Sequence, residues 1–474
     1  MLCAHSSRRS SALAFLLAVL LAVAVPAAAQ VTGTIAGTTK DASGAVLPGV
    51  TVTVTGPALQ RASASATSSA DGTYRVTLLP PGTYDVKFEL SGFSAVSRRA
   101  VEVAINQQTT VDASLAVGGV TESVDVSGTS PLVEVNRSDL TSRVSSRTID
   151  ALPLNGRNFV DLVGLAPGAR PVPEGQQGAN VSIFGERAAA LSFLVDGADN
   201  NDPLNGGPFI RYTQDSIREF EVITTGYEAE FGRAQGGVVN IATRSGTNAL
   251  DGRAFWFRRD DAFDSSNVEG QEPPALGRNQ WGGTLGGPIK RNKAFFFGSF
   301  ERLDENRAVN IDRSKIPGFV QSGIATPGGT EDFGIGPNTG AYTLVGKFDY
   351  TINDANRFTL TGNGNNEDIS GLIGSPVAGT QALPSAAGTS SGNGYALIGR
   401  ETALFGSRTF LESTLGYTSA DNGTNLDRTT RSEPLLLLLR SPGFLQTGAP
   451  FGGKVQRDTT RLQLNETLSH MTAG

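Results

Sequence analysis

The sequence is nearly devoid of the side chains that carry most metal and nucleophilic chemistry. It contains one cysteine, Cys3, and two histidines, His5 and His470. Two of these three lie in an N-terminal segment that we expect to be removed, which would leave no thiol and a single histidine near the end of the chain. Disulfides, zinc–thiolate sites and cysteine nucleophiles are thereby excluded, and a histidine-based metal site or general base lacks its residues. These absences argue against an enzyme, and we expect no cofactor and no metal.

A basic surface is lacking as well. The chain has 39 Lys and Arg residues against 45 Asp and Glu residues, a formal charge of −6. Loss of Arg8 and Arg9 with the N-terminal segment would lower this charge by two, to −8. Because proteins bind nucleic-acid phosphates through clustered Lys and Arg side chains, no nucleic-acid partner is expected.

Long apolar runs are absent except at the N-terminus. Arg8 and Arg9 precede the apolar run 12–25, and three alanines follow at 27–29. This order of positive, apolar and small residues is typical of a secretory signal peptide, whose cleavage would remove residues 1–29. A membrane anchor is the alternative, but about 14 residues at a rise of 1.5 Å fall short of a hydrocarbon core about 30 Å thick.

The sequence is rich in glycine, with 58 residues placed between short runs of Thr, Val and Phe. This composition predicts a mainly β protein of several units. Over residues 30–117, short alternating runs between turn residues predict a seven-stranded β-sandwich. The expected strands are Val31–Thr38, Val50–Thr55, Ala62–Thr67, Thr73–Leu78, Thr83–Leu90, Ala100–Ala104 and Thr109–Val117.

Turn motifs in this segment carry a family resemblance. They are residues 47–50 (L-P-G-V), 71–74 (D-G-T-Y) and 79–84 (L-P-P-G-T-Y), preceded by 31–35 (V-T-G-T-I) and the turn 41–44. Together they resemble the carboxypeptidase regulatory-like domain. The resemblance implies a sandwich that is non-catalytic, as the domain is in that family.

The next segment, 118–140, is rich in Ser, Thr, Val and Asp and is predicted to be a linker. Within it lie Thr121, Glu122, Ser123, Val124, Asp125 and Val126. A free extended strand with alternate valines is suited to adding onto the edge of a partner's sheet. This stretch resembles a TonB box, through which a TonB-type periplasmic energy-coupling protein pulls on a transporter. An ordinary extended linker is the alternative.

Residues 141–247 contain four ordered motifs. They are 152–159 (L-P-L-N-G-R-N-F), 193–197 (F-L-V-D-G), 217–222 (I-R-E-F-E-V) and 231–241 (F-G-R-A-Q-G-G-V-V-N-I). This series resembles the plug domain of TonB-dependent outer-membrane receptors, and the first motif behind a sandwich domain points to the Oar-like subgroup. The resemblance implies a small αβ plug, with motif residues Asn155, Gly156, Arg157, Asp196, Gly197, Gly236, Gly237 and Asn240. A free-standing αβ domain is the alternative.

Local patterns within this unit predict short helical pieces over Ser146–Leu152 and Phe159–Leu165. A strand pair is expected from Val181–Phe184 and Leu191–Val195, followed by a strand over Ile217–Thr224. The adjacent Gly236 and Gly237 would let backbones pack closely, as a plug inside a barrel requires.

From residue 248 onwards the chain alternates strand and turn, which is typical of an antiparallel transmembrane β-barrel. The expected strands are Gly252–Arg259, Asn279–Pro288, Lys293–Arg302, Tyr342–Thr351, Arg357–Gly362, Ala396–Phe405, Thr409–Tyr417 and Thr459–Leu468. Long outer loops are expected near 318–340 and 371–394. Aromatic residues expected at the lipid headgroups are Phe255, Trp256, Phe257, Trp281, Phe295, Phe297 and Tyr417. A soluble β-sandwich would show the same alternation.

The length of this last segment predicts an incomplete barrel. A plugged barrel of 22 strands needs roughly 200 to 240 residues in its wall alone, whereas residues 248–474, with their loops, provide for about eight or nine strands. Because an open sheet edge cannot rest in lipid, we expect that this chain alone does not insert as a working transporter.

Two motifs resemble catalytic or metal-binding signatures but lack the context that such chemistry needs. Residues 388–392 spell the G-x-S-x-G of a nucleophile elbow, but they lie in an expected loop without strand, helix or partner histidine. The acidic stretch 196–202 lacks the spacing of a calcium loop and is predicted to be a polar turn.

The sequence therefore predicts a plug-gated transporter in the outer membrane, with the N-terminal domain in the periplasm, lipid around the barrel and an unknown transported ligand. The alternative is a surface, interaction or protein-export component that uses the sandwich to bind an envelope partner. Siderophore, oligosaccharide, peptide and cobalamin all remain open as substrates, so carbohydrate binding is one expectation among several.

Overall fold

The computed structural model describes most of the chain. The described residues are 32–118, 123–127, 140–152, 154–172, 181–227, 231, 234–265, 275–307, 337–353, 355–372, 380–382, 388–406, 409–425, 435–440, 443–448 and 454–470. The expected signal peptide lies outside them. The fold is mainly β, as the sequence predicts, and consists of a sandwich, a small αβ unit and part of a large antiparallel sheet. None of the helices in the described residues has the length and apolarity to cross a membrane.

The N-terminal unit is a β-sandwich of two sheets. One sheet has the order β4-β1-β7, with β8 also paired to β1, and the other has the order β3-β2-β5-β6-β9. The strands are β1 (Gly33–Asp41), β2 (Thr51–Thr55), β3 (Ala64–Thr67), β4 (Thr73–Leu79), β5 (Gly82–Glu89), β6 (Ala95–Val103), β7 (Gln108–Thr110), β8 (Ala113–Leu115) and β9 (Ser123–Ser127). The seventh expected strand is thus divided into β7 and β8. Residues of β1 to β6 and of β8 enter one apolar core, which includes Val52, Val54 and Phe88.

The strand β9 comes from the segment expected to be a linker. It pairs in parallel with β6, and its register runs from Ala95 opposite Ser123 to Arg99 opposite Ser127. β9 therefore forms an edge of the second sandwich sheet. The first two residues of the expected TonB box, Thr121 and Glu122, lie outside the described residues.

The αβ unit follows. Its sheet has the order β10-β15-β16-β13-β14. These strands are β10 (Leu140–Ser145), β15 (Ile217–Thr225), β16 (Gly237–Thr243), β13 (Leu191–Val195) and β14 (Ala198–Asp199). The helical elements are α2 (Ser146–Ala151) and the 3-10 turns η1 (Asn155–Arg157), η2 (Phe159–Leu165), η3 (Ala188–Ala190) and η4 (Gln214–Ser216). The two helical pieces expected from the sequence are present as α2 and η2.

One expected pairing in this unit is wrong. β12 (Val181–Ile183) pairs with β11 (Ala169–Pro171), whereas β13 pairs in parallel with β16 and antiparallel with β14. The chain leaves β12 through Phe184 and Gly185, which have φ of 49° and 84°, and then forms η3. These left-handed residues and the 3-10 turn direct β13 into a different sheet.

The C-terminal part is one antiparallel sheet in which eight strands lie in chain order. They are β17 (Asp251–Asp260), β18 (Leu276–Lys290), β19 (Ala294–Arg307), β20 (Asn338–Asn353), β21 (Asn356–Leu372), β23 (Gly388–Phe405), β24 (Thr409–Asn425) and β27 (Lys454–His470). The 3-10 turn η6 (Asp261–Phe263) follows β17, and β22 (Thr380–Ala382), β26 (Gly443–Gly448) and β25 (Leu435–Arg440) form a small separate sheet. All eight strands overlap with expected ones, and each is longer than expected. Most exceed the about 9 to 11 residues that a strand needs to span the hydrocarbon core.

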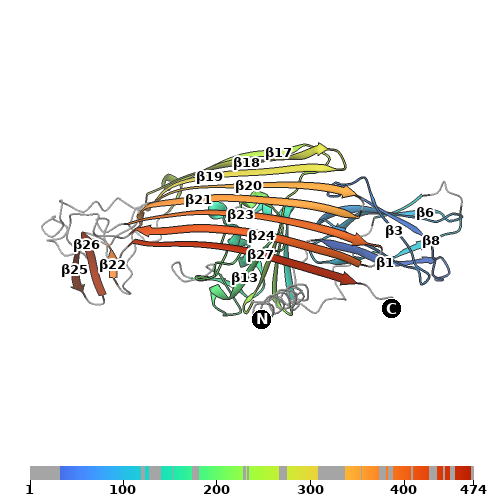
Figure 1. The fold of residues 1–474 in the computed structure, drawn as a ribbon, viewed down its shortest axis with the longest axis horizontal. Helices are drawn as coiled ribbons and strands as arrows, with labels where there is room; N and C mark the ends of the chain where they lie inside the picture. Colours follow the sequence, from blue (N-terminus) through green and yellow to red (C-terminus); the bar gives the residue numbers. More distant parts are fainter. Residues whose placement is uncertain are drawn as a thin grey trace, which may run out of the picture.

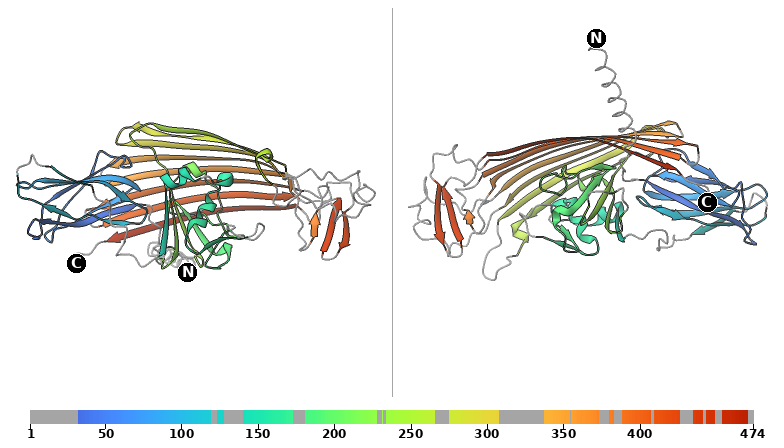
Figure 2. Two further views of the ribbon diagram at one scale, coloured as in Figure 1. Left: turned by 180° about the vertical axis from the view of Figure 1, so that it is seen from behind. Right: turned by 60° about the horizontal axis from the view of Figure 1, so that its bottom comes forward.

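The arrangement places the αβ unit against the concave face of this sheet and the sandwich beside one end of it (Figure 1). Figure 2 shows, in its right-hand view, the sheet arching over the αβ unit. The short turns, such as the one between β20 and β21, lie at the sandwich end, where Asn353 and Asn356 line a cavity together with Leu59 of the sandwich. The long connections, such as 308–337 between β19 and β20, leave from the opposite end.

The two faces of the large sheet differ in chemistry. Lys347 and Asp349 of β20 are buried on the concave face, whereas Tyr342 and Leu344 are exposed on the convex face. This alternation matches the polar-in, apolar-out pattern of outer-membrane barrels.

Four of the seven aromatic residues expected at the lipid headgroups are on the concave face instead. Phe295 and Phe297 are buried, and the Arg157 guanidinium lies over the rings of Phe255 and Phe257. The two-residue period of a strand explains the error, because every second aromatic in a run must point inward. Trp256, Trp281 and Tyr417 are exposed, as expected.

The stretch 388–394 was expected to belong to a long loop, but it forms the first part of β23. Gly and Ser residues there pair with β21 and β24 along the whole stretch. The rejected G-x-S-x-G motif therefore lies within an extended strand, without the strand-to-helix turn that exposes a nucleophile.

Candidate functional site

The strongest concentration of buried charge lies between the αβ unit and the concave face of the sheet. At one end of it is the motif Asn155-Gly156-Arg157, which forms η1. Gly156 has φ of 77°, a left-handed conformation that glycine adopts without steric cost. The Asn155 side-chain oxygen accepts hydrogen bonds from Arg278 at 2.6 Å and Arg259 at 3.1 Å, both on sheet strands. The turn is thus attached to β17 and β18.

Arg157, the next residue of the motif, is buried and forms further contacts between the αβ unit and the sheet. Its Nη2 lies 2.7 Å from Oδ2 of Asp215, within the αβ unit, and its Nε lies 3.2 Å from Oε2 of Glu301 on β19. The guanidinium carbon is 4.1 Å from the ring centre of Phe255, a cation–π contact. Gln280 completes the group by donating to Oε1 of Glu301 at 2.7 Å. One buried cation therefore connects a carboxylate of each unit.

Asp196 forms a second buried attachment and is 1% exposed. Its Oδ1 accepts from the Thr243 amide at 2.9 Å, and its Oδ2 accepts from Thr361 at 2.9 Å and from Lys347 Nζ at 3.1 Å. Burial alone would raise the pKa of Asp196. The neighbouring Lys347 and Arg400 charges, with the hydrogen bonds from Thr243, outweigh burial and lower this pKa to about 2. Asp196 is therefore ionised at every physiological pH.

The remaining motif residues shape the backbone around these attachments. Gly197 follows Asp196 with φ of 82°, which favours glycine. Gly236 leads into Gly237, where β16 begins with φ of 135° and a Cβ would lie 3.0 Å from the Ile223 carbonyl oxygen. Asn240 is fully buried in the middle of β16. The glycines thus permit the close approach of β16 to its neighbours.

The acidic turn 196–202 also contacts the sheet through charge. Oδ1 of Asp199 lies 2.9 Å from Nη1 of Arg461, and Oδ2 of Asp202 lies 2.8 Å from Nη2 of Arg457, both on β27. Burial would raise the pKa of Asp202, but backbone hydrogen bonds from Leu204 and the next residue, with the Arg457 charge, lower it. These acids therefore act as counter-ions for the sheet.

The sandwich is attached to both other units. The Ile105 amide donates to Oε2 of Glu219 in β15 at 2.9 Å. Nε2 of Gln60 donates to the Gly246 carbonyl at 2.9 Å and to Oδ2 of Asp349 at 3.0 Å. Burial raises the pKa of Glu219 to about 7, although the Ile105 hydrogen bond opposes the rise.

This arrangement is suited to holding the αβ unit in place. Each charge described above faces a counter-charge or a hydrogen-bond partner, and the pairs link separate units. In the part of the chain that the structure describes, no group of three or more His, Cys, Asp or Glu residues is placed to hold a metal ion. Removing one partner of a buried pair costs about 3 to 5 kcal/mol, whereas the intact pair contributes little net free energy.

Sequence reasoning placed Arg157 and Asp196 in motifs but missed their partners on the sheet. These partners are Glu301 and Lys347. A signal existed for Lys347, because strand alternation placed it on the polar face of Tyr342–Thr351. Nothing in the sequence indicated which residue of the αβ unit it would meet.

Two family models match the chain. The model of the carboxypeptidase regulatory-like domain matches residues 34–116, and that of the outer membrane beta barrel domain matches residues 242–317. The first match covers the strands β1 to β8, and the second covers β17 to β19.

Known proteins are similar over larger parts. The TonB-dependent transporter Oar of Myxococcus xanthus is 30% identical over 350 residues, which are 68% of this chain and 32% of that protein. The outer membrane transporter YddB of Escherichia coli matches with a TM-score of 0.50 at 14% identity, over 71% of this chain and 46% of that structure. The siderophore receptor PirA of Acinetobacter baumannii gives a TM-score of 0.48 at 17% identity, over 69% of this chain and 45% of that structure. The chain spans about a third of the length of the curated relative that it matches.

Proposed function

This chain belongs to the TonB-dependent receptors of the outer membrane, and we propose that it provides the plug and part of the wall of an energised transporter. In this proposal residues 30–117 are the sandwich domain, 118–140 the linker, 141–247 the plug and 248–474 part of the barrel. The relative at 30% identity is a TonB-dependent transporter. Uptake of a bulky or scarce solute would require the plug to move or remodel inside the barrel.

The polar seam between plug and sheet is the observation that carries this proposal. Asp196 with Lys347, and Arg157 with Glu301, are buried ion pairs between the two units. A seam of charges holds the plug in one position, yet water can solvate its groups when the plug moves. A seam of apolar side chains would instead expose hydrophobic surface at a cost of about 25 cal/mol per Å². The plug motifs thus have a physical role as releasable contacts.

The orientation that we propose places the sandwich in the periplasm and the convex sheet face against lipid. Outer-membrane barrels have short periplasmic turns and longer extracellular loops. The short turns lie at the sandwich end of the sheet, and the ends of β19 and β24, from which the long connections start, lie at the other. A transported ligand would therefore approach the plug from the end opposite the sandwich.

Energy coupling is proposed to act through residues 121–126, the expected TonB box. The part within β9 is already extended and lies at a sheet edge, paired on one side with β6. A strand in this position has unpaired backbone groups on its outer side, which a TonB-type protein could bind by strand addition.

The coupling proposal is tested with the full chain and the periplasmic domain of a TonB-type protein from the same organism. Deletion of residues 121–126, or Val124→Pro, should abolish binding in a pull-down, because proline removes a backbone donor. Val124→Ile is the matched control and should bind like the unchanged chain. Equal binding by all variants would instead favour the surface or export role for the sandwich.

The transported solute is tested in cells. A strain lacking the gene is grown on candidate siderophores, oligosaccharides, peptides and cobalamin, and the gene is then restored with or without the Val124→Pro change. Loss of growth on one nutrient, rescued by the unchanged gene alone, would identify the solute class and support energised uptake. Rescue by both genes would contradict coupling through residues 121–126.

A further inference from the structure

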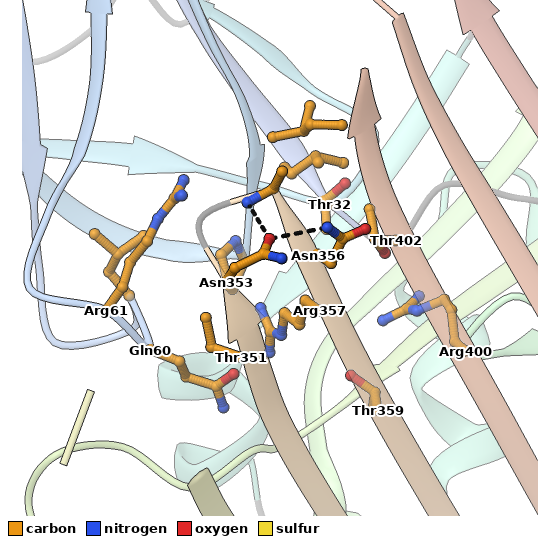
Figure 3. A pocket seen from close by; sticks show the side chains of 15 residues that line it. Thr32, Gln60, Arg61, Thr351, Asn353, Asn356, Arg357, Thr359, Arg400 and Thr402 are labelled. Atoms are coloured by element: carbon orange, nitrogen blue, oxygen red, sulfur yellow. Dashed lines mark hydrogen bonds between the residues drawn. The ribbon is translucent and has the colours of Figure 1, made fainter. Parts of the chain in front are cut away.

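A loop of the sandwich reaches the short-turn end of the large sheet. The loop is the connection 56–63 between β2 and β3. Leu59 packs in the sandwich core, and the next residue, Gln60, is 4% exposed. Figure 3 shows Gln60 with Thr351 and Arg357 of the sheet, which line the same cavity of about 60 Å³. Because loops normally lie on the surface, a buried glutamine in this loop indicates a specific contact with the other units.

The Gln60 side chain contacts two different units. Its Nε2 donates to the carbonyl oxygen of Gly246 at 2.9 Å and to Oδ2 of Asp349 at 3.0 Å. Gly246 belongs to the connection that leaves the plug, between β16 and β17, whereas Asp349 lies on β20 of the sheet. A Cβ at Gly246 would collide with the carbonyl oxygen of Phe296, so this connection is packed directly against the sheet. One side chain of the sandwich thus binds both the end of the plug and the sheet.

A second contact holds the plug at the strand next to the linker. The amide of Ile105, in the connection between β6 and β7, donates to Oε2 of Glu219 at 2.9 Å, and both residues are buried. Glu219 lies on β15, directly opposite Ser145 of β10. A Cβ at Gly82 of the sandwich would lie 3.2 Å from Nη2 of Arg218, so the sandwich also packs against this guanidinium. The sandwich therefore supports the strand pair of β10 and β15, which the linker joins.

The docked sandwich restrains the plug against the sheet. It is joined to the plug through Ile105 and to the sheet through the contact of Gln60 with Asp349. A plug that moves relative to the sheet must therefore break at least one of these contacts. Both are hydrogen bonds that water can replace, and contacts between units of one chain commonly permit relative motion. The restraint is thus of a kind that can be released without unfolding the sandwich.

A pull on the expected TonB box acts on the sandwich directly. β9 belongs to the second sandwich sheet, where Val124 lies opposite Val96 of β6. On its other side, β9 is connected to β10 of the plug through residues 128–139. Tension applied at residues 121–126 therefore acts on the sandwich through the pairing with β6 and on the plug through the linker.

We propose that the sandwich is a lock on the plug, which a pull on residues 121–126 releases before the plug moves. A pull through β9 undocks the sandwich, and this frees the plug for the pull through the linker. The source of the pull rests on the proposed coupling function, whereas the lock rests on the contacts of Gln60 and Ile105. Loss of TonB-type binding in the pull-down would remove the source of the pull and leave the lock, which variants of Gln60 test without any partner.

The lock is tested by hydrogen exchange of the full chain folded in detergent. Gln60→Ala should speed exchange of the Ile105 amide, and of the amides that pair β10 with β15, roughly fivefold, the effect of one lost hydrogen bond. Lys87→Ala, at an exposed residue further along β5 that pairs with Glu89, is the control and should exchange like the unchanged chain. Faster exchange at Ile105 without a change in β10 and β15 would mean that the docked sandwich does not restrain the plug, and would overturn the lock.

A crosslink shows whether Gln60 acts through docking. Thr32 of the sandwich and Thr402 of the sheet line the same cavity (Figure 3), and the one natural cysteine, Cys3, lies in the expected signal peptide. Thr32→Cys and Thr402→Cys, joined by a short bifunctional thiol reagent, should restore slow exchange in the Gln60→Ala chain. The same cysteine pair without the reagent is the control. Exchange that stays fast after joining would contradict docking as the cause.

The release is tested by pulling single molecules of the full chain in an optical trap. The handles are attached through Thr121→Cys and through Phe263→Cys, at a side chain 90% exposed beyond the far end of β17. A first rupture should lengthen the tether by less than about 65 Å, the reach of residues 122–139, whereas unfolding of the plug releases roughly 300 Å or more.

The first rupture is assigned by its response to the seam. Gln60→Ala should lower the force of this rupture and leave the later ones unchanged, because it weakens docking alone. Lys87→Ala is again the control and should change no rupture. A first rupture that Gln60→Ala does not alter would mean that β9 slips from β6 while the sandwich stays docked, and would overturn the release.

Discussion

The sandwich and the plug–sheet seam are held together by opposite means. The sandwich core is built from aliphatic and aromatic side chains such as Val54 and Phe88, which are fully buried. Buried charges of Arg157, Asp196 and Lys347 cross the seam, beside a few apolar contacts such as that of Val345 with the plug core. Apolar burial stabilises a unit in any orientation of its neighbours, whereas ion pairs stabilise a single orientation. The apolar core thus keeps the sandwich folded, and the ion pairs of the seam hold the plug in one orientation against the sheet.

The largest effect is expected from damage to the sandwich core. Phe88 is 0% exposed and packs edge-to-face on Tyr74 at 5.4 Å between ring centres. Phe88→Ala should lower the free energy of unfolding of the sandwich by about 3 to 5 kcal/mol. Limited proteolysis in urea of the full chain measures this loss. Val117→Ala, at a side chain 83% exposed, is the control, and equal proteolysis of both variants would contradict an apolar core.

The seam should respond to a broken pair more than to a neutralised one. Lys347→Met leaves the Asp196 carboxylate buried without its cation and should destabilise plug docking by roughly 3 kcal/mol. The double variant Lys347→Met with Asp196→Asn removes both charges and should recover most of this loss, since asparagine also tolerates the left-handed φ of 47° at this position. Hydrogen exchange of the Thr243 amide, which donates to Asp196, reports on both. If this amide exchanges as fast in the double variant as in the single one, the two charges do not act as a pair.

A smaller effect, which depends on pH, is expected where the sandwich meets the plug. The pKa of Glu219 is about 7 in the folded protein against an ordinary value of 4.5. A carboxyl whose pKa is raised on folding favours the folded state at low pH, so docking should weaken as pH rises from about 4.5 to about 7 and then level off. Exchange of the Ile105 amide measured across this range should show the slope. Glu219→Gln should abolish it, and a slope that persists would assign the titration to another group.

The smallest effect is expected at a turn of the sandwich. Gly44 has φ of 91°, and a Cβ there would meet no atom within 4 Å. Gly44→Ala should therefore cost only the backbone strain, about 1 kcal/mol. Gly237→Ala in the plug should cost more, because its Cβ would also lie 3.0 Å from the Ile223 carbonyl oxygen. Thermal midpoints of the two variants test this order, and equal shifts would mean that the close packing of β16 contributes nothing.

Local patterns in the sequence predicted the strands well and their partners poorly. All eight strands of the large sheet were expected in order, because alternation within each strand records which face is buried. Their ends were misplaced since polar residues beyond the membrane, as in 388–394, resemble a loop. The predicted pairing of β12 with β13 was wrong because the chain turns away at Phe184, which has a left-handed φ. Phenylalanine rarely adopts this conformation, so the sequence does not indicate it.

Contacts between distant segments could not be predicted at all. Asp196 was placed in a motif by resemblance, but Lys347 lies 151 residues later and nothing local connects them. The sandwich is attached to the plug through the backbone amide of Ile105. Because every residue except proline has such an amide, the sequence gives no sign of this contact. The roles of the motif residues and of residues 121–126 stay predictions until they are measured.

The position of β10 has a mechanical consequence. It is the first plug strand after the linker and lies at the edge of the plug sheet, where β15 is its one sheet neighbour among the described residues. Tension arriving along the linker would load β10 before any other part of the plug. Its side-chain attachments include the Arg143–Glu221 ion pair, 3.2 Å apart, and the burial of Val144 in the plug core. The plug would therefore yield by losing its outermost strand first, while the parallel pair of β13 and β16 stays bound to the sheet through Asp196.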